Sequence, residues 1–119
     1  MWTRRANIAI IVCAYTNSKT HIVTSCDLQG TTQWEFKDER VLKRPLGICV
    51  DNDGNVYVVG GDSINVVVIF PDGQHHRQLL SSNDGLVATG VLDYERSTNM
   101  LLFVNKSGTA FLYDVSRGQ

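Results

Sequence analysis

The chain has 119 residues and a formal net charge of −1 at pH 7, from 11 Lys and Arg against 12 Asp and Glu. This balance excludes a strongly basic chain whose overall field would draw it to nucleic acid or to an acidic membrane. Hydrophobic residues make up 43% of the sequence, which is typical of a folded protein and excludes a disordered chain. The length suffices for one modest domain with a single core.

An apolar run at 8–15 opens the chain, directly after a short basic start. Basic then apolar residues also begin a secretory signal, but no clear small-residue cleavage site follows, so we favour a β-strand. The run is too short to span a bilayer, which takes about 20 residues. Turn residues at 17–19 and at Gly30 then separate two further strands, predicted at 20–27 and 31–37.

The middle of the chain, 45–80, reads as four short strands with a turn after each. We predict strands at 46–51, 55–60, 64–70 and 74–80. Asp53-Gly54, Gly60-Gly61 and Pro71-Asp72-Gly73 supply the turns between them. Four such strands make an antiparallel meander, which is the shape of one β-propeller blade.

After a polar loop at 81–86, three more strands are predicted at 88–93, 99–104 and 109–114. The stretch from Met100 to Val104 is continuously apolar. That pattern favours a central strand buried on both faces.

An internal repeat links these segments. Gly30 and Gly73 lie 43 residues apart in similar turns, and Asp51 and Asp93 align at a spacing of 42. A period near 42 with four strands per unit is typical of a propeller, which has about 40–50 residues per blade. We therefore predict an all-β fold over 1–119, made of consecutive four-stranded antiparallel meanders that form an incomplete, open β-propeller. Its blades are expected at 7–37 (without the inner strand), 45–80 (complete) and 87–115 (without the outer strand).

The segment PLGICVDNDGNVYVV, followed by NVVVIFPDG, resembles the NHL repeat. In particular it is similar to the NHL propellers that end many tripartite-motif (TRIM) proteins. The resemblance is good over this repeat and weaker over the other two. It implies a six-bladed propeller used as a binding platform, of which this chain would hold about two and a half blades.

Three cysteines, Cys13, Cys26 and Cys49, stand at wide spacings with no Cys/His cluster of metal-ligand spacing. We interpret them as three small buried hydrophobic residues of a protein in a reducing compartment, which favours a cytoplasmic location.

No catalytic, cofactor-binding or metal-binding residues are expected. Asp51-Asn52-Asp53-Gly54-Asn55 resembles a calcium loop, but its glycine comes two places too early and no Glu stands at the twelfth position. His75 and His76 are adjacent, so on a strand they point to opposite faces and cannot share a metal. No nucleophile elbow of the G-x-S-x-G type occurs. The chain is therefore expected to be a binding module and not an enzyme.

A charged loop at 37–44 is the most distinctive surface feature. We expect it to share one face of the propeller with the loops at 17–19, 60–63, 81–86 and 105–107. The candidate partner-binding residues on this face are Lys37, Arg40, Lys43, Arg44, Asp62, Ser63, Asn105 and Lys106. The alternative is that these are ordinary solvated loop charges, half cancelled by Asp38 and Glu39.

Three functions stay open. The favoured one is a protein-binding platform, the substrate-recognition part of a TRIM-NHL-type ubiquitin ligase whose RING domain lies outside this chain. The second is binding of single-stranded RNA by the same face, and the third is a fragment of a six-bladed propeller hydrolase or lyase. No membrane partner is expected.

The open ends of such an arc should expose apolar blade faces. We expect those faces to include Val12, Val66, Val68, Leu101 and Phe103. The isolated chain should then self-associate or aggregate, or fold stably only when further blades or chains complete the ring.

Overall fold

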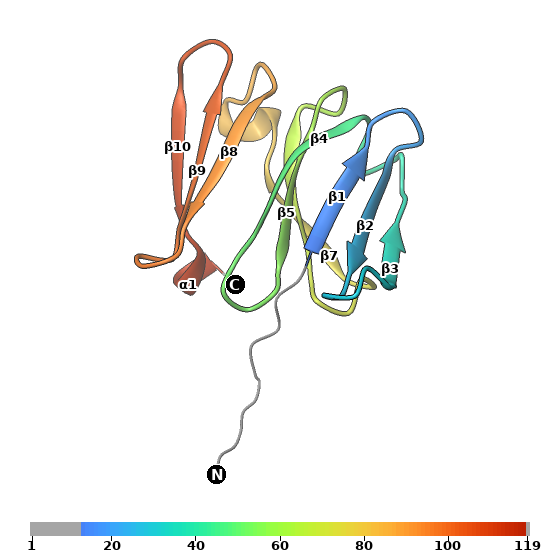
Figure 1. Ribbon diagram of the computed structural model, residues 1–119. Coiled ribbons are helices and arrows are strands. Elements are labelled where there is room, and N and C mark those ends of the chain that lie inside the picture. The colour runs from blue at the N-terminus through green and yellow to red at the C-terminus, as the bar shows by residue number, and fades with distance from the viewer. Residues whose placement is uncertain (1–12, 119) are drawn as a thin grey trace.

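The computed structural model describes residues 13–118, and these form an all-β structure of three antiparallel sheets (Figure 1). The first sheet contains β1 (Cys13–Asn17), β2 (Ile22–Cys26) and β3 (Thr32–Phe36). The second contains β4 (Pro45–Val50), β5 (Val56–Gly60), β6 (Asn65–Ile69) and β7 (His76–Leu80). The third contains β8 (Gly90–Glu95), β9 (Met100–Asn105) and β10 (Ala110–Asp114). The remaining elements are a 3₁₀ turn, η2 (Ser82–Asp84), and one helical turn, α1 (Val115–Gly118).

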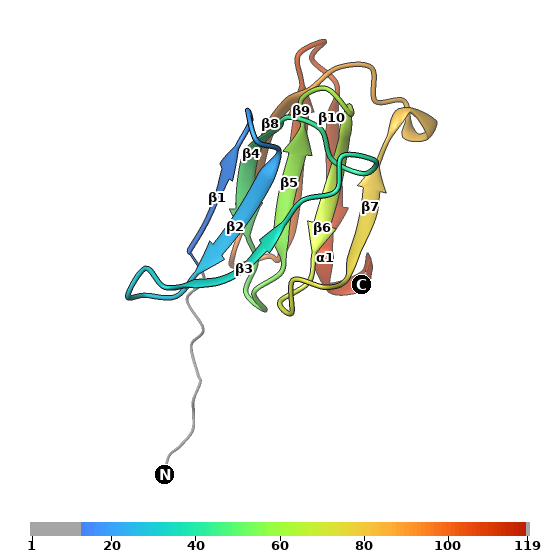
Figure 2. The same cartoon turned by 90° about the vertical axis from the view of Figure 1, so that its right-hand side faces the viewer.

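Each sheet is a meander in which every strand pairs with its neighbours in the sequence. The three sheets stand face to face in chain order, with the four-stranded sheet in the middle (Figures 1 and 2). No sheet closes on itself among the described residues. The predicted incomplete propeller of antiparallel meanders is therefore confirmed as a fold class.

The strand predictions agree closely with the structure. From β2 onward the largest differences are of two residues: β2, β7 and β8 begin two residues later than predicted, and β8 also ends two residues later. Most of the strand predicted at 8–15 lies outside the described residues, and β1 continues to Asn17 because Tyr15, Thr16 and Asn17 pair with β2.

Three hairpin turns explain why the meanders form. They begin at Asp27, Asp51 and Asn105, and in each the glycine three residues later has a positive φ of 84° to 93°. The amide of the first residue donates to the carbonyl of the fifth at 3.0 Å, and the side-chain oxygen of the first accepts the amide of the fifth. This is the type I turn with a glycine bulge that joins antiparallel strands.

The repeat is slightly longer than the sequence spacing indicated. Corresponding strands of successive sheets begin 43 to 45 residues apart. The alignment of Asp51 with Asp93 was wrong, because Asp51 follows β4 in a turn whereas Asp93 lies within β8. Gly30 and Gly73 do occupy equivalent turns, and both have a positive φ.

The middle sheet carries the core. Every residue of β5 and β6 is buried, since the first sheet covers one face of the middle sheet and the third sheet covers the other. Val66, Val68, Leu101 and Phe103 are at most 2% exposed. The expectation that these four face solvent was therefore wrong, and Val12 lies outside the described residues.

The outer face of the third sheet is apolar and exposed instead. Val91 is 72% exposed and Leu112 is 67% exposed, and they lie beside the partly exposed Leu102 and Val104. We call these four residues the outer apolar face. β9 alternates between buried and exposed positions, so the prediction that it is buried on both faces was wrong for this chain. Among residues 13–118, only one face of β9 has a neighbouring sheet.

Candidate partner-binding loop end

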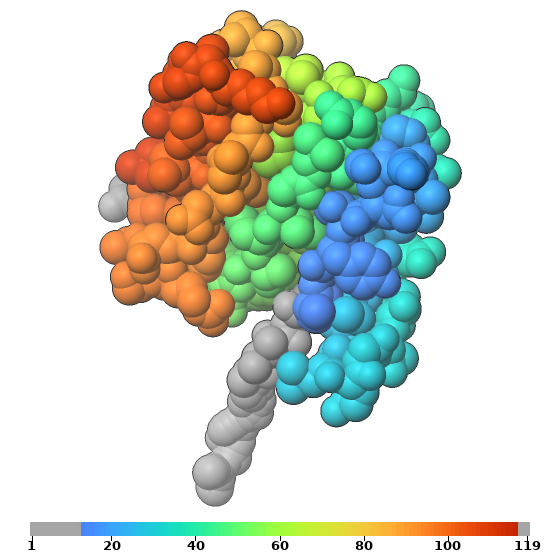
Figure 3. Space-filling model, turned by 45° about the horizontal axis from the view of Figure 1, so that its top comes forward, coloured from blue at the N-terminus to red at the C-terminus, as the bar shows by residue number. Residues whose placement is uncertain are grey.

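The loops at 17–21, 37–44, 60–65, 81–90 and 105–109 lie at one end of the molecule, which is the upper end in Figure 1 and comes forward in Figure 3. We call this the loop end. The hairpin turns at 27–31, 51–55, 70–75 and 95–99 lie at the opposite end, the turn end. The sheets thus bring together all the loops that were expected to share a face.

The backbone of the loop at 37–44 is fixed by contacts with the rest of the molecule. The amides of Val41 and Leu42 donate to the carbonyl of Asp38, which closes a turn, and the Leu42 side chain is completely buried. Asn65 Nδ2 donates to the Val41 carbonyl at 2.7 Å and to Gln78 Oε1 at 2.9 Å. These contacts attach the loop to β6 and β7, so its backbone is fixed before any partner binds.

Arg44 joins three loops. Its backbone has a positive φ of 55°, its amide donates to His21 Nδ1 at 2.9 Å, and its carbonyl accepts the amide of Gly61. The Arg44 guanidinium pairs with Asp62 at 2.7 Å and lies so close to Gly61 that a Cβ there would come within 2.8 Å of it. No sequence pattern predicts that Arg44 and Asp62, 18 residues apart, form a pair.

Most of the remaining cations of this loop also have carboxylate partners. Arg40 makes a bidentate contact with Asp38, with both N–O distances at 3.0 Å, and this hydrogen bonding holds the pKa of Asp38 below its usual value. Lys37 lies 3.8 Å from Glu39, which also lies 3.8 Å from His21. The local cancellation of charge that the sequence suggested is thus built into the loop.

Two cations differ from these. Lys43 and Lys106 are exposed and form no ion pair with any of residues 13–118. Their backbones are nevertheless fixed, because the carbonyl of Lys43 accepts the amide of Asp62 and the amide of Lys106 donates to the carbonyl of Thr89. Lys19, in the loop at 17–21, is likewise exposed and forms no ion pair with these residues, so Lys19, Lys43 and Lys106 are the unpaired cations of the described loop end.

Two other predicted site residues have structural roles. Asn105 is only 3% exposed, and its Oδ1 accepts the amide of Thr109 and the hydroxyl of Ser107. Ser63 Oγ accepts the amide of Lys43 at 3.0 Å and donates to Asn65 Oδ1 at 2.7 Å. The side chains of Asn105 and Ser63 hold the loops in place and are not available to a partner.

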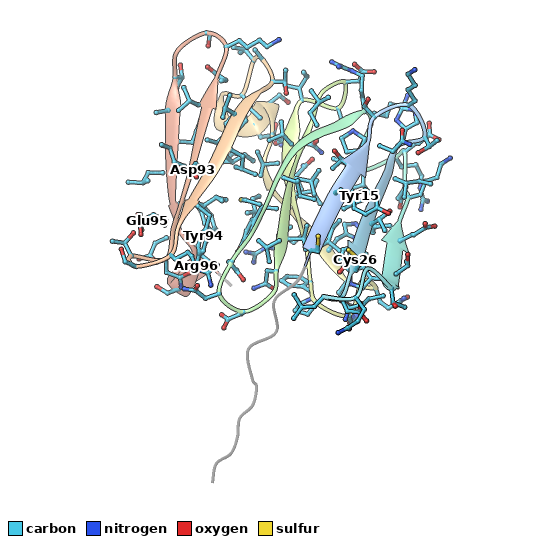
Figure 4. All side chains as sticks on the ribbon, in the orientation of Figure 1. Tyr15, Cys26, Asp93, Tyr94, Glu95 and Arg96 are labelled. Atoms are coloured by element: carbon cyan, nitrogen blue, oxygen red, sulfur yellow. The ribbon has the colours of Figure 1, made fainter. Side chains whose placement is uncertain are left out.

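The cysteines do not form one class. Cys26 is buried, Cys49 is partly buried and Cys13 is exposed, so the expectation of three buried thiols was wrong for Cys13. Cys13 and Cys26 are free thiols that lie opposite each other on the neighbouring strands β1 and β2, and Cys26 is labelled on the first sheet in Figure 4. Burial, with the nearby Asp93 and Asp51, raises the pKa of Cys49 to about 12.

No group of three or more His, Cys, Asp or Glu side chains among residues 13–118 is placed to hold a metal ion. Within the same residues, the structure contains no helix with the length and apolar character of a membrane span.

Comparison with known proteins supports the fold. No protein-family model and no curated protein sequence matches the chain. Solved structures do match, among them a nidogen/laminin complex (TM-score 0.68, 23% identity over 89% of this chain), a streptogramin B lyase (0.55, 16%, 87%) and the selenomethionine form of virginiamycin B lyase from Staphylococcus aureus (0.53, 13%, 85%). The chain spans 41%, 37% and 36% of those chains, respectively. These likenesses indicate a β-propeller-like fold.

Proposed function

We propose that the chain is part of a β-propeller that binds a protein partner through its loop end and has no catalytic role of its own. The observation that supports this is the contrast at the loop end between a fixed backbone and cations that form no ion pair with residues 13–118, among them Lys43 and Lys106. A rigid scaffold that presents loop side chains is the usual arrangement of a binding surface.

The NHL resemblance favours a more specific role. In this role, the complete propeller would be the substrate-recognition end of a TRIM-NHL-type ubiquitin ligase in the cytoplasm. The catalytic RING domain would belong to another part of the parent protein. The nidogen/laminin complex is an assembly of two proteins, which is consistent with a protein partner.

RNA is the less favoured ligand. Binding of single strands needs aromatic side chains on which bases stack, and the five loops of the loop end contain no Phe, Tyr or Trp. Arg40 and Arg44 are also engaged by Asp38 and Asp62. The only support for a hydrolase or lyase function is the structural likeness to two lyases, at 16% and 13% identity.

The test is a quantitative capture experiment from cell extract, using three forms of the parent protein. The first is the natural sequence, the second carries Lys43→Glu and Lys106→Glu, and the third carries Arg96→Glu as a control. Arg96 is exposed and lies at the turn end (Figure 4); its backbone carbonyl accepts Asn52 Nδ2, and its side chain forms no ion pair with residues 13–118. Its replacement therefore reverses one positive charge away from the loop end, against two in the double variant.

Proteins that bind the loop end should be captured about tenfold less by the double variant and equally by the control, since each exposed charge pair contributes up to about 1 kcal/mol. Replacing Arg40, Lys43 and Arg44 with Ala should also weaken capture while leaving the fold intact. Equal capture by all forms would contradict the proposal. Loss of capture after RNase treatment of the extract would favour the RNA alternative. So would direct binding of naked RNA that weakens steeply when the salt concentration is raised modestly.

A further inference from the structure

A cleft lies at the turn end, between the first two sheets, on the opposite side of the molecule from the loop end. Its volume is about 310 Å³, which is at the lower limit of small-ligand sites. Three lining residues come from the first sheet and four from the turns that follow β4 and β6, which Figure 2 shows at the lower end. The lining residues are Ser25, Gln33, Trp34, Asp53, Gly54, Pro71 and Asp72.

The Trp34 indole forms a fixed wall of this cleft. Its Nε1 donates to the carbonyl of Pro71 at 3.1 Å. The ring lies directly against Gly73, where an added Cβ would come within 2.3 Å of Trp34 Cγ. Because both contacts join the first sheet to the second, the ring is held in place without a ligand.

Two carboxylates give the cleft its negative charge, and they differ in how they are engaged. Asp72 accepts the amides of Gln74 and His75 and lies 2.6 Å from His75 Nδ1, and these hydrogen bonds lower the pKa of Asp72. Asp53 is exposed, and its carboxylate has no hydrogen bond or ion pair with residues 13–118. No Lys or Arg of residues 13–118 lines the cleft.

We propose that this cleft binds the guanidinium group of an arginine side chain from a peptide or protein partner. A guanidinium is flat, so it stacks on an indole, and its N–H groups match the two oxygens of one carboxylate. Trp34 and Asp53 supply these two elements, and Gln33 Oε1, which accepts the Ser25 hydroxyl at 3.2 Å, adds an acceptor. An anionic ligand would meet two aspartates instead. The proposal uses none of the loop-end residues, so it stands independently of the proposed function.

The test is an NMR titration of the chain with N-acetyl-arginine amide, followed at the indole N–H of Trp34. The chain is used with Val91, Leu102, Val104 and Leu112 changed to Thr, which we call the polar-face variant. These side chains lie on the outer apolar face and do not line the cleft, and removing them favours a soluble monomer. N-acetyl-citrulline amide, which has the same shape without the charge, is the control ligand.

Arginine amide should shift the Trp34 signal saturably, and citrulline amide should not. Asp53→Asn should weaken the affinity about two- to fivefold, the range expected for one exposed charge pair, and should leave the fold intact because the Asp53 side chain has no bond to lose. Asp93→Asn, an exposed carboxylate on the third sheet (Figure 4), should change nothing. No saturable shift, equal shifts with citrulline amide, or equal effects of the two Asp variants would overturn the proposal.

Discussion

At the scale of single residues, two turns show the difference between a conformational and a packing requirement for glycine. Gly73 and Gly108 both have a positive φ, of 71° and 93°. An added Cβ at Gly73 would collide with Trp34, whereas at Gly108 it would meet nothing within 4 Å.

Gly108→Ala should therefore cost about 1 kcal/mol of unfolding free energy, from backbone strain alone. Gly73→Ala should cost about 3 kcal/mol, because overpacking adds roughly 1–3 kcal/mol to that strain. Urea unfolding of the polar-face variant measures both. Equal losses would show that Trp34 does not pack on Gly73 as described.

Asp51 is a buried carboxylate that holds the β4–β5 turn. Besides two turn amides, its oxygens accept Asn55 Nδ2 at 2.9 Å and the Tyr57 hydroxyl at 2.7 Å. Asp51→Ala would remove this acceptor from all four donors, including the two on the buried Asn55, so it should cost about 3 kcal/mol. Asp27→Ala, in a more exposed turn of the same type, should cost about 1 kcal/mol by the same measurement. A smaller loss at Asp51 than at Asp27 would contradict this account.

The thiols should react in a definite order. Burial raises the pKa of Cys26 and Cys49, whereas Cys13 is exposed. With iodoacetamide at pH 8, followed by mass spectrometry, Cys13 should react at least about tenfold faster than the other two, since only the thiolate is nucleophilic. Denaturant should abolish the difference, and preferential labelling of Cys49 in the folded chain would contradict the burial described.

Cys49 also gives a pH dependence of stability. Its pKa is 9.0 for the unperturbed group and about 12 in the fold. A raised folded pKa contributes stability that is fully present below about pH 9 and is lost as the pH rises towards 12. Cys49→Ser should therefore flatten the alkaline limb of the stability curve.

At the scale of elements, the loop at 37–44 depends on one buried anchor. Leu42 is 0% exposed and lies in the core cluster with Val23 and Phe36. Leu42→Ala should cost about 2–5 kcal/mol, the usual range for a buried leucine. The neighbouring Val41, only partly buried, is the matched control, and Val41→Ala should cost about 1 kcal/mol. Similar losses at both positions would contradict the anchoring role of Leu42.

The elements were largely predictable because each strand has a local cause. Alternating or apolar runs and the Asp/Asn-x-x-Gly turns are visible in the sequence, and they specify hairpins through contacts within a few residues. The faces were less predictable. Val66 and Phe103 are buried by residues of other sheets, which are distant in the sequence. The local sequence of β9 does not indicate which of its faces another sheet covers.

The candidate sites show the same limit. The charged loop and its position at the loop end followed from the order of strands and turns. The role of Asn105 is local, since its side chain bonds to Ser107 and Thr109 in its own turn. The pairing of Arg44 with Asp62 and the cleft beside Trp34 depend instead on contacts between residues 18 and 37 positions apart. Such contacts are set by the stacking of sheets and leave no local pattern.

At the scale of the whole molecule, the three sheets form an arc with an unpartnered apolar end. The outer apolar face corresponds to the side of the third sheet on which a following blade of a propeller would stack. Stable soluble monomers rarely expose contiguous apolar patches larger than a few hundred Å². We therefore expect the isolated chain to self-associate through this exposed apolar face.

Sedimentation velocity of the isolated chain beside the polar-face variant shows whether the outer apolar face drives self-association. We expect the natural sequence to sediment as a dimer or larger species, and the four Thr substitutions to shift it to a monomer with an unchanged circular dichroism spectrum. A monodisperse, cooperatively melting monomer of the natural sequence would contradict this expectation.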